Sequence, residues 1–132
     1  EKALEIDSSI SEVQFNLATL AHVSGRYDEA LSFYDRALAL EPEYVAALSN
    51  KGAILQSRGR DRAALRCYDR ALEIEGDNVA VMVNRAMLLS KVDELEKAKA
   101  QYERALRLDG DDEEILRAIA NLKARLATER HR

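Results

Sequence analysis

Apolar and small residues recur along this chain at the spacing of a helix face, with breaks at regular places. Ala21 lies four residues after Leu17 and three after Ala18, the sequence SGRY at 24–27 interrupts the spacing, and Ala30 begins a second apolar face. Spacings of three and four are typical of an amphipathic helix, and Gly favours a turn. The stretch therefore predicts a helix, a short turn and a second helix.

This pattern repeats with a period of 34 residues. YDRAL occupies 34–38 and 68–72, YERAL occupies 102–106, and units starting at residues 11, 45 and 79 align without a gap. Small residues and one tyrosine ring per unit fall in register, and a small residue facing a large one lets two helices pack closely. These positions are Ala18, Gly52 and Ala86; Ala30, Ala64 and Ala98; Ala37, Ala71 and Ala105; and Tyr34, Tyr68 and Tyr102.

Proline or glycine follows the second helix of each unit. The pairs are EP at 41–42, EG at 75–76 and DG at 109–110. Pro cannot continue a helix and Gly suits its left-handed end, so these pairs predict where the second helices stop. We expect helices at 11–24, 28–41, 45–58, 62–75, 79–91, 95–108 and 113–130.

The string NLATLAHVSGRYDEALSFYDRALALEP, with its period of 34 residues, resembles a tetratricopeptide repeat. The resemblance covers three repeats at 11–44, 45–78 and 79–112. It also aligns 1–10 with the end of a preceding repeat, and 113–132 with a C-terminal capping helix and tail. It implies an all-α fold, a right-handed superhelical array of antiparallel helix pairs, or α-solenoid. The sequence departs from the family pattern at Gln14, Lys51 and Arg85, and at Asp93, where the turn lacks glycine.

By this alignment the chain starts inside a helix. A stub of about six residues is not stable alone in water, so Leu4 and Ile6 require a helix partner. We therefore expect that at least one more repeat precedes this sequence in a longer protein. The stub also supports an alternative to a monomer, namely self-association through the N-terminal end.

Composition argues against several classes of partner. The formal charge of -4 is spread along the chain without a basic stripe, which argues against a nucleic-acid partner. No run of about 18 apolar residues exists, so no membrane partner is expected. The single cysteine, Cys67, cannot form an internal disulfide and slightly favours the cytoplasm, although nothing in the sequence fixes the compartment.

The chain offers few groups for catalysis. Its two histidines are His22 and His131, and His22 lies on a first helix with no acidic or thiol partner at metal-ligand spacing. Cys67 aligns with Phe33 and Gln101, which indicates a packing position. Glycines occur singly, without a phosphate-binding loop. We expect no enzyme activity, no cofactor and no metal.

Three asparagines, Asn16, Asn50 and Asn84, fall in register on the first helices. Asn is a middling helix former, so three in register require an explanation. The resemblance implies that first helices line a concave groove that takes up an extended peptide or a partner's helix, where carboxamides can pair with its backbone. The alternative is an inherited residue that faces water. The other residues expected in this groove are Phe15, Thr19, Ser49, Val83 and Met87.

Some members of this family hold the C-terminal carboxylate of heat-shock chaperones with Lys, Arg and Asn side chains. Only one of the five corresponding positions here carries the required residue, and neither neighbouring frame improves the match. Without a cation the carboxylate would lose its charge-assisted hydrogen bonds. We therefore predict that this chain does not bind chaperone tails in that way. The five positions are Phe15, Thr19, Asn50, Ala80 and Asn84.

The sequence predicts a protein–protein interaction module that binds an extended peptide or partner segment. Two alternatives remain open. The segment could recruit substrates for an enzyme domain of a larger protein, or it could be a self-assembly scaffold.

Overall fold

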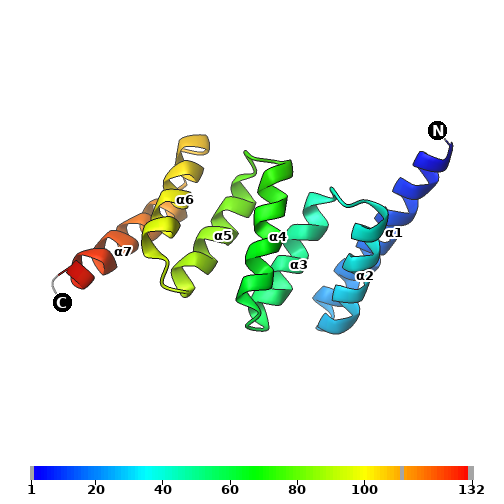
Figure 1. The fold of residues 1–132 in the computed structure, drawn as a ribbon, viewed down its shortest axis with the longest axis horizontal. Coiled ribbons are helices and arrows are strands. Elements are labelled where there is room, and N and C mark those ends of the chain that lie inside the picture. Colours follow the sequence, from blue (N-terminus) through cyan, green and yellow to red (C-terminus); the bar gives the residue numbers. More distant parts are fainter. Residues whose placement is uncertain (1, 111, 131–132) are drawn as a thin grey trace. The chain divides into compact units, whose positions relative to one another are not determined.

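A computed structural model describes residues 2–110 and 112–130, with side chains described from residue 9 onward. These residues form seven α-helices and no strand (Figure 1). The helices are α1 (Lys2–Val23), α2 (Tyr27–Leu40), α3 (Val45–Ser57), α4 (Asp61–Ile74), α5 (Val79–Lys91), α6 (Leu95–Leu108) and α7 (Glu113–Arg130). None of the described helices is long and apolar enough to cross a membrane.

Six of the seven helices match the predicted ranges within one residue at each end, whereas α1 does not. The predicted start at residue 11 is wrong, because α1 runs without a break from Lys2 to Val23. Ser8 stands where the three repeats have Pro42, Gly76 and Gly110, so no helix breaker separates residue 10 from residue 11. The side chains of Leu4 and Ile6 lie outside the described residues, as does His131.

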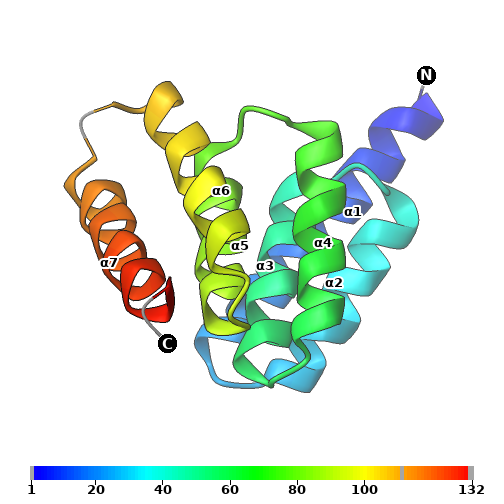
Figure 2. The ribbon, with the colours of Figure 1, turned by 60° about the vertical axis from the view of Figure 1, so that its left-hand side comes forward.

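The helices form two compact units, Glu1–Ile74 and Glu75–Arg132, here called the N-terminal and C-terminal units. In the N-terminal unit α1 packs against α2, α3 against α4, and α2 against α3. In the C-terminal unit α6 packs against both α5 and α7 (Figure 2). Each helix pair thus corresponds to one sequence repeat, and α7 covers the last second helix.

The core of the N-terminal unit is built from the small residues and rings of the repeat. Ala18, Ala30 and Tyr34 are fully buried and pack with Ala47 and Ile54 of α3. In the next repeat a Cβ on Gly52 would lie only 2.7 Å from a ring carbon of Tyr68. Close helix packing against tyrosine therefore recurs, as the sequence predicted.

The turns between paired helices need a residue with positive φ. Gly25 and Gly59 take φ values of 78° and 77°, and Asp93 takes 63° in the third turn. Glycine adopts this region freely, whereas Asp does so at some cost. The third turn therefore keeps the same path without glycine.

Candidate peptide-binding surface

The three register asparagines lie on the first helices, as expected from their positions in the sequence. Asn16 on α1 is exposed, while Asn50 on α3 and Asn84 on α5 are partly buried. Within the described part of the chain their carboxamides form no hydrogen bond, so their donors and acceptors are available to a ligand.

Two residues expected in the groove are instead engaged inside the N-terminal unit. The Phe15 ring stacks on Tyr44 with centroids 4.9 Å apart and meets Tyr34 edge-on at 5.8 Å. The Thr19 hydroxyl donates to the Phe15 carbonyl over 3.0 Å and lies 3.3 Å from the Tyr34 hydroxyl oxygen. These contacts join α1 to Tyr34 of α2 and to Tyr44 at the start of α3, and they leave little of either side chain for a ligand.

The remaining expected residues differ in exposure. Ser49 and Val83 are partly buried, whereas Met87 on α5 is 52% exposed. Methionine is flexible and polarisable, which suits contact with varied apolar side chains. Of the apolar positions proposed for the groove, Met87 is the most accessible.

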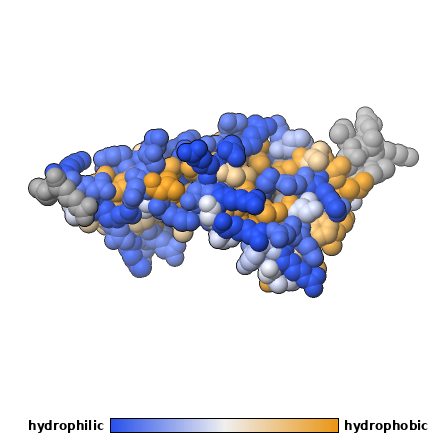
Figure 3. All heavy atoms as spheres, turned by 60° about the horizontal axis from the view of Figure 1, so that its bottom comes forward, coloured by the Kyte–Doolittle hydropathy of each residue, from blue (hydrophilic) through white to orange (hydrophobic). Residues whose placement is uncertain are grey.

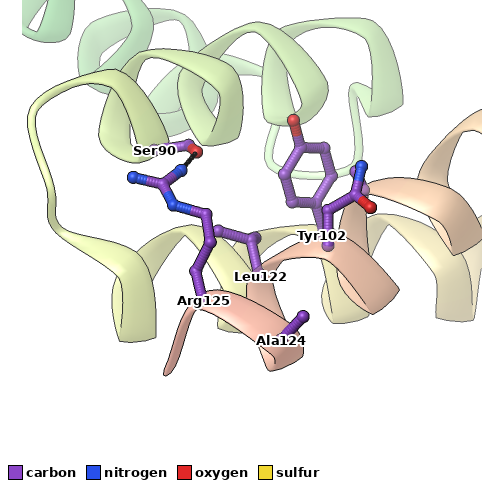
Figure 4. Close-up of a pocket in the computed structure, with 7 residues that line it drawn as sticks. Ser90, Tyr102, Leu122, Ala124 and Arg125 are labelled. Atoms are coloured by element: carbon purple, nitrogen blue, oxygen red, sulfur yellow. Dashed lines mark hydrogen bonds between the residues drawn. The ribbon is translucent and has the colours of Figure 1, made fainter. Parts of the chain in front are cut away.

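The C-terminal unit contains a pocket of about 600 Å³ beside Met87's helix. Figure 4 shows Ser90 of α5, Tyr102 of α6 and Arg125 of α7 converging on it. Its α7 residues Ala118 and Asn121 follow Asn84 and Met87 by one period of 34, so they occupy groove positions of the repeat. The full lining is Ser90, Tyr102, Ala118, Asn121, Leu122, Ala124 and Arg125.

Arg125 forms one wall of this pocket. Its Nη1 donates to Ser90 Oγ over 2.9 Å and its Nη2 donates to Asp93 Oδ1 over 3.0 Å. Asp93 thereby offsets the charge of the guanidinium, and three of the five N–H groups remain for other acceptors. The wall suits a neutral acceptor, such as a peptide carbonyl, better than a free carboxylate.

The Tyr102 hydroxyl is the second polar group of the pocket. In the first two repeats the equivalent hydroxyls have side-chain partners, since Tyr34 lies against Thr19 and Tyr68 donates to Gln56 over 3.1 Å. Ser90 takes the place of Gln56 in the third repeat, and it accepts from Arg125 instead. Within the described residues Tyr102 has no hydrogen-bond partner, and burial raises its pKa, which keeps it a neutral donor.

Sequence reasoning did not identify this pocket. The repeat pattern predicts a packing role for Tyr102, and Arg125 lies in a helix beyond the three full repeats. One signal in the sequence pointed toward it. Asn121 and Arg125 follow Met87 and Lys91 by one period of 34, so the repeat places both on the groove face of the last helix. The contact of Arg125 with Ser90 and Asp93 depends on how α7 packs, which the pattern does not specify.

The described residues show no arrangement typical of a metal centre or a reactive thiol. No group of three or more His, Cys, Asp or Glu side chains among them could hold a metal ion. Cys67 is buried, and burial raises the pKa of its thiol, which lowers the thiolate fraction at neutral pH.

Comparison with known families agrees with the repeat and the helix pairs. The tetratricopeptide repeat model matches residues 9–75 and 43–111. The chain belongs to the tetratricopeptide repeat family. A comparison with curated proteins found no match.

Several solved tetratricopeptide repeat structures share the fold. The first such domain of Spaghetti (RPAP3), bound to the HSP90 peptide SRMEEVD, has a TM-score of 0.86 and 21% identity, covering 91% of this chain and 95% of its own. The Arabidopsis OM64 domain has a TM-score of 0.84 and 20% identity, and the match covers 90% of this chain and 98% of that domain. The first tetratricopeptide repeat domain of human RPAP3 has a TM-score of 0.85 and 19% identity, and the match covers 94% of this chain and 98% of that domain. At these identities the likeness establishes a common fold.

Proposed function

We propose that this tetratricopeptide repeat chain binds an extended segment of a partner protein on its first helices and catalyses no reaction. The observation that carries the proposal is the pocket of about 600 Å³ in the C-terminal unit, lined from groove positions of α5 and α7. Family membership and the peptide bound to the Spaghetti (RPAP3) domain support the same mode of binding.

Different side chains take different roles in this mode. Asn16, Asn50 and Asn84 would pair with the peptide backbone, because a carboxamide both donates and accepts. Met87 would contact an apolar side chain, with Val83 beside it. We assign Phe15 and Thr19 to positioning α1 rather than to direct contact, because their side chains are engaged with Tyr34 and Tyr44.

The pocket would anchor one residue of the bound segment. Tyr102 and Arg125 offer donors, and Asn121 offers both a donor and an acceptor. Because Asp93 offsets Arg125, the anchored group would be a neutral acceptor such as a carbonyl, a hydroxyl or a carboxamide. A charged ligand would gain less from this site.

Affinity capture from source lysate, with mass spectrometry as readout, tests the proposal. Two variants are compared with the wild type, one with Asn16, Asn50 and Asn84 changed to Ala, and one with Asn121→Ala and Arg125→Ala. The control changes Ser32 and Arg66 to Ala, two exposed residues of second helices. Circular dichroism verifies that all chains are folded.

A partner captured by the wild type and the control, and lost with both site variants, would support groove binding. Loss with the pocket variant alone would restrict the site to the C-terminal unit. Equal capture by every chain would refute the proposed surface.

A further inference from the structure

The hydroxyl of Tyr102 lacks the acceptor that its counterparts in the first two repeats have. Tyr102 is only 6% exposed, and it lines the pocket of the C-terminal unit together with Ser90 (Figure 4). Within the described residues its hydroxyl forms no hydrogen bond. A phenol that is largely removed from water gains free energy from an acceptor, so this hydroxyl favours an acceptor that enters the pocket.

In the first two repeats, a residue of the first helix supplies this acceptor. The Thr19 hydroxyl oxygen lies 3.3 Å from the Tyr34 hydroxyl, and it accepts there because its own proton goes to a backbone carbonyl. In the second repeat the carboxamide oxygen of Gln56 accepts from Tyr68 over 3.1 Å. The repeat thus completes its buried tyrosine with a neutral oxygen.

Neither position supplies such an acceptor in the third repeat. The residues that correspond to Thr19 and Gln56 are Met87 and Ser90. Met87 offers only a thioether, which is a weak acceptor. The Ser90 hydroxyl accepts from Arg125 over 2.9 Å. Serine is also shorter than glutamine, and a pocket of about 600 Å³ is lined by Ser90 and Tyr102.

The polar groups of the pocket include both donors and an acceptor. Tyr102 donates, Arg125 keeps N–H groups beyond its bonds to Ser90 and Asp93, and the Asn121 side chain both donates and accepts. A primary carboxamide matches this set, because its oxygen accepts and its NH2 group donates. A carboxylate only accepts, and it would lie near the carboxylate of Asp93.

The lining also suits a side chain with an apolar stem and a polar end. Hydrophilic residues cover much of the face drawn in Figure 3, and hydrophobic residues appear between them in patches. The pocket is mixed in the same way, because its polar residues alternate with Ala118, Leu122 and Ala124. The methylene groups of a bound side chain would contact these three residues while its polar end reaches Tyr102.

We propose that the pocket of the C-terminal unit recognises the carboxamide of a Gln or Asn side chain in the bound segment. This carboxamide takes the place beside Tyr102 that Gln56 holds beside Tyr68. Its oxygen accepts from Tyr102, and its NH2 group donates to Asn121. The inference rests on the proposed peptide binding and narrows it to one class of anchor residue.

Selection from a random peptide library displayed on phage tests the inference without a known partner. Peptides bound to the wild type are sorted by whether they lose binding to the variant with Asn121→Ala and Arg125→Ala. Those that depend on the pocket should carry Gln or Asn at one fixed position. Pocket-dependent peptides without this preference would overturn the inference and leave the proposed binding intact. A library with no pocket-dependent peptide would contradict both.

Ser90→Gln supplies the acceptor from the chain itself, as Gln56 does in the second repeat. Isothermal titration should show that a selected peptide binds this variant about tenfold more weakly, the effect of losing one hydrogen bond. The matched control is Ser32→Gln, which places the same side chain at an exposed position of α2 and should bind like the wild type. Equal affinity for the two variants would count against the inference.

Tyr102→Phe distinguishes recognition of the carboxamide from simple blocking of the pocket. It breaks no hydrogen bond within the described residues, so its melting temperature should stay close to that of the wild type. Replacing the anchor of the peptide by an apolar residue of similar size, Met for Gln or Leu for Asn, should weaken binding to the wild type about tenfold. Tyr102→Phe should lose most of this preference. An undiminished preference would show that the carboxamide binds elsewhere and would overturn the inference.

Discussion

Gly52 lets α3 approach Tyr68 more closely than any other residue would. An added Cβ would lie 2.7 Å from one ring carbon and 3.1 Å from another. We expect Gly52→Ala to destabilise the fold by about 1 kcal/mol, because overpacking costs about 1–3 kcal/mol and better helix propensity returns about 1. Urea unfolding measures the change.

Ala18 occupies the same repeat position with a methyl group, which makes Ala18→Gly the matched control. It should lower stability by about 1 kcal/mol through helix propensity and lost packing. A gain in stability for Gly52→Ala would show that Tyr68 moves aside without cost.

Because Tyr68 is buried, the free energy of unfolding should vary with pH in the alkaline range. Burial, with a smaller contribution from Cys67, raises the pKa of Tyr68 from 10.0 to about 12. The folded state thus favours the neutral phenol, so its contribution is complete below about pH 10, the unfolded pKa, and is lost as pH rises toward 12. Thermal unfolding should show a midpoint that falls across this range.

Tyr68→Phe separates this effect from general alkaline unfolding. At neutral pH the variant should lose about 1 kcal/mol, because Gln56 loses its hydrogen-bond donor. Between pH 10 and 12 its stability should fall less steeply than that of the wild type. Parallel pH curves for the two proteins would contradict the assignment to Tyr68.

Among the helices, α7 depends on a single side chain for its N-terminal cap. Asp112 Oδ1 accepts from the backbone N–H groups of Glu114 and Ile115 over 2.9 Å and 3.2 Å. Asp112→Ala should lower the free energy of unfolding by about 1 kcal/mol. Asp112→Ser should keep most of the cap's stabilising effect, because Ser is also a good N-cap residue. Hydrogen exchange of the α7 amides measures the change. Equal exchange rates for Asp112→Ala and Asp112→Ser would show that the cap contributes nothing.

The period of 34 allowed most helices to be predicted from the sequence. The pocket could not be predicted, because it depends on how α7 packs. Pro42, Gly76 and Gly110 stand two residues after the ends of α2, α4 and α6, so these boundaries can be read locally. Ser8 gives no such signal, so the pattern predicts a helix start at residue 11 where α1 continues without a break. Arg125 lies 35 residues from Ser90 and 32 from Asp93, so its contacts follow from the packing of α7 and not from local pattern.

For the molecule as a whole, likeness of fold does not imply likeness of ligand. The Spaghetti (RPAP3) domain was solved with the HSP90 peptide SRMEEVD, and the two folds superpose with a TM-score of 0.86. In this chain the positions of the carboxylate clamp hold Phe15 and Thr19, which are engaged internally, and Ala80, which has no cation. The chain also carries a net charge of -4, which would repel an acidic peptide.

We therefore expect no carboxylate-dependent binding of SRMEEVD to this chain. Without cations a bound carboxylate would give up its hydration for neutral groups, which costs more than it returns. Isothermal titration with the free-acid peptide and with its C-terminally amidated form measures this directly, with the Spaghetti (RPAP3) domain as positive control. Equal or absent heats for both peptides are the expected result. Binding of the free acid that amidation abolishes would mean that another cation supplies the clamp, and Arg125→Ala would then show whether the pocket of the C-terminal unit is its source.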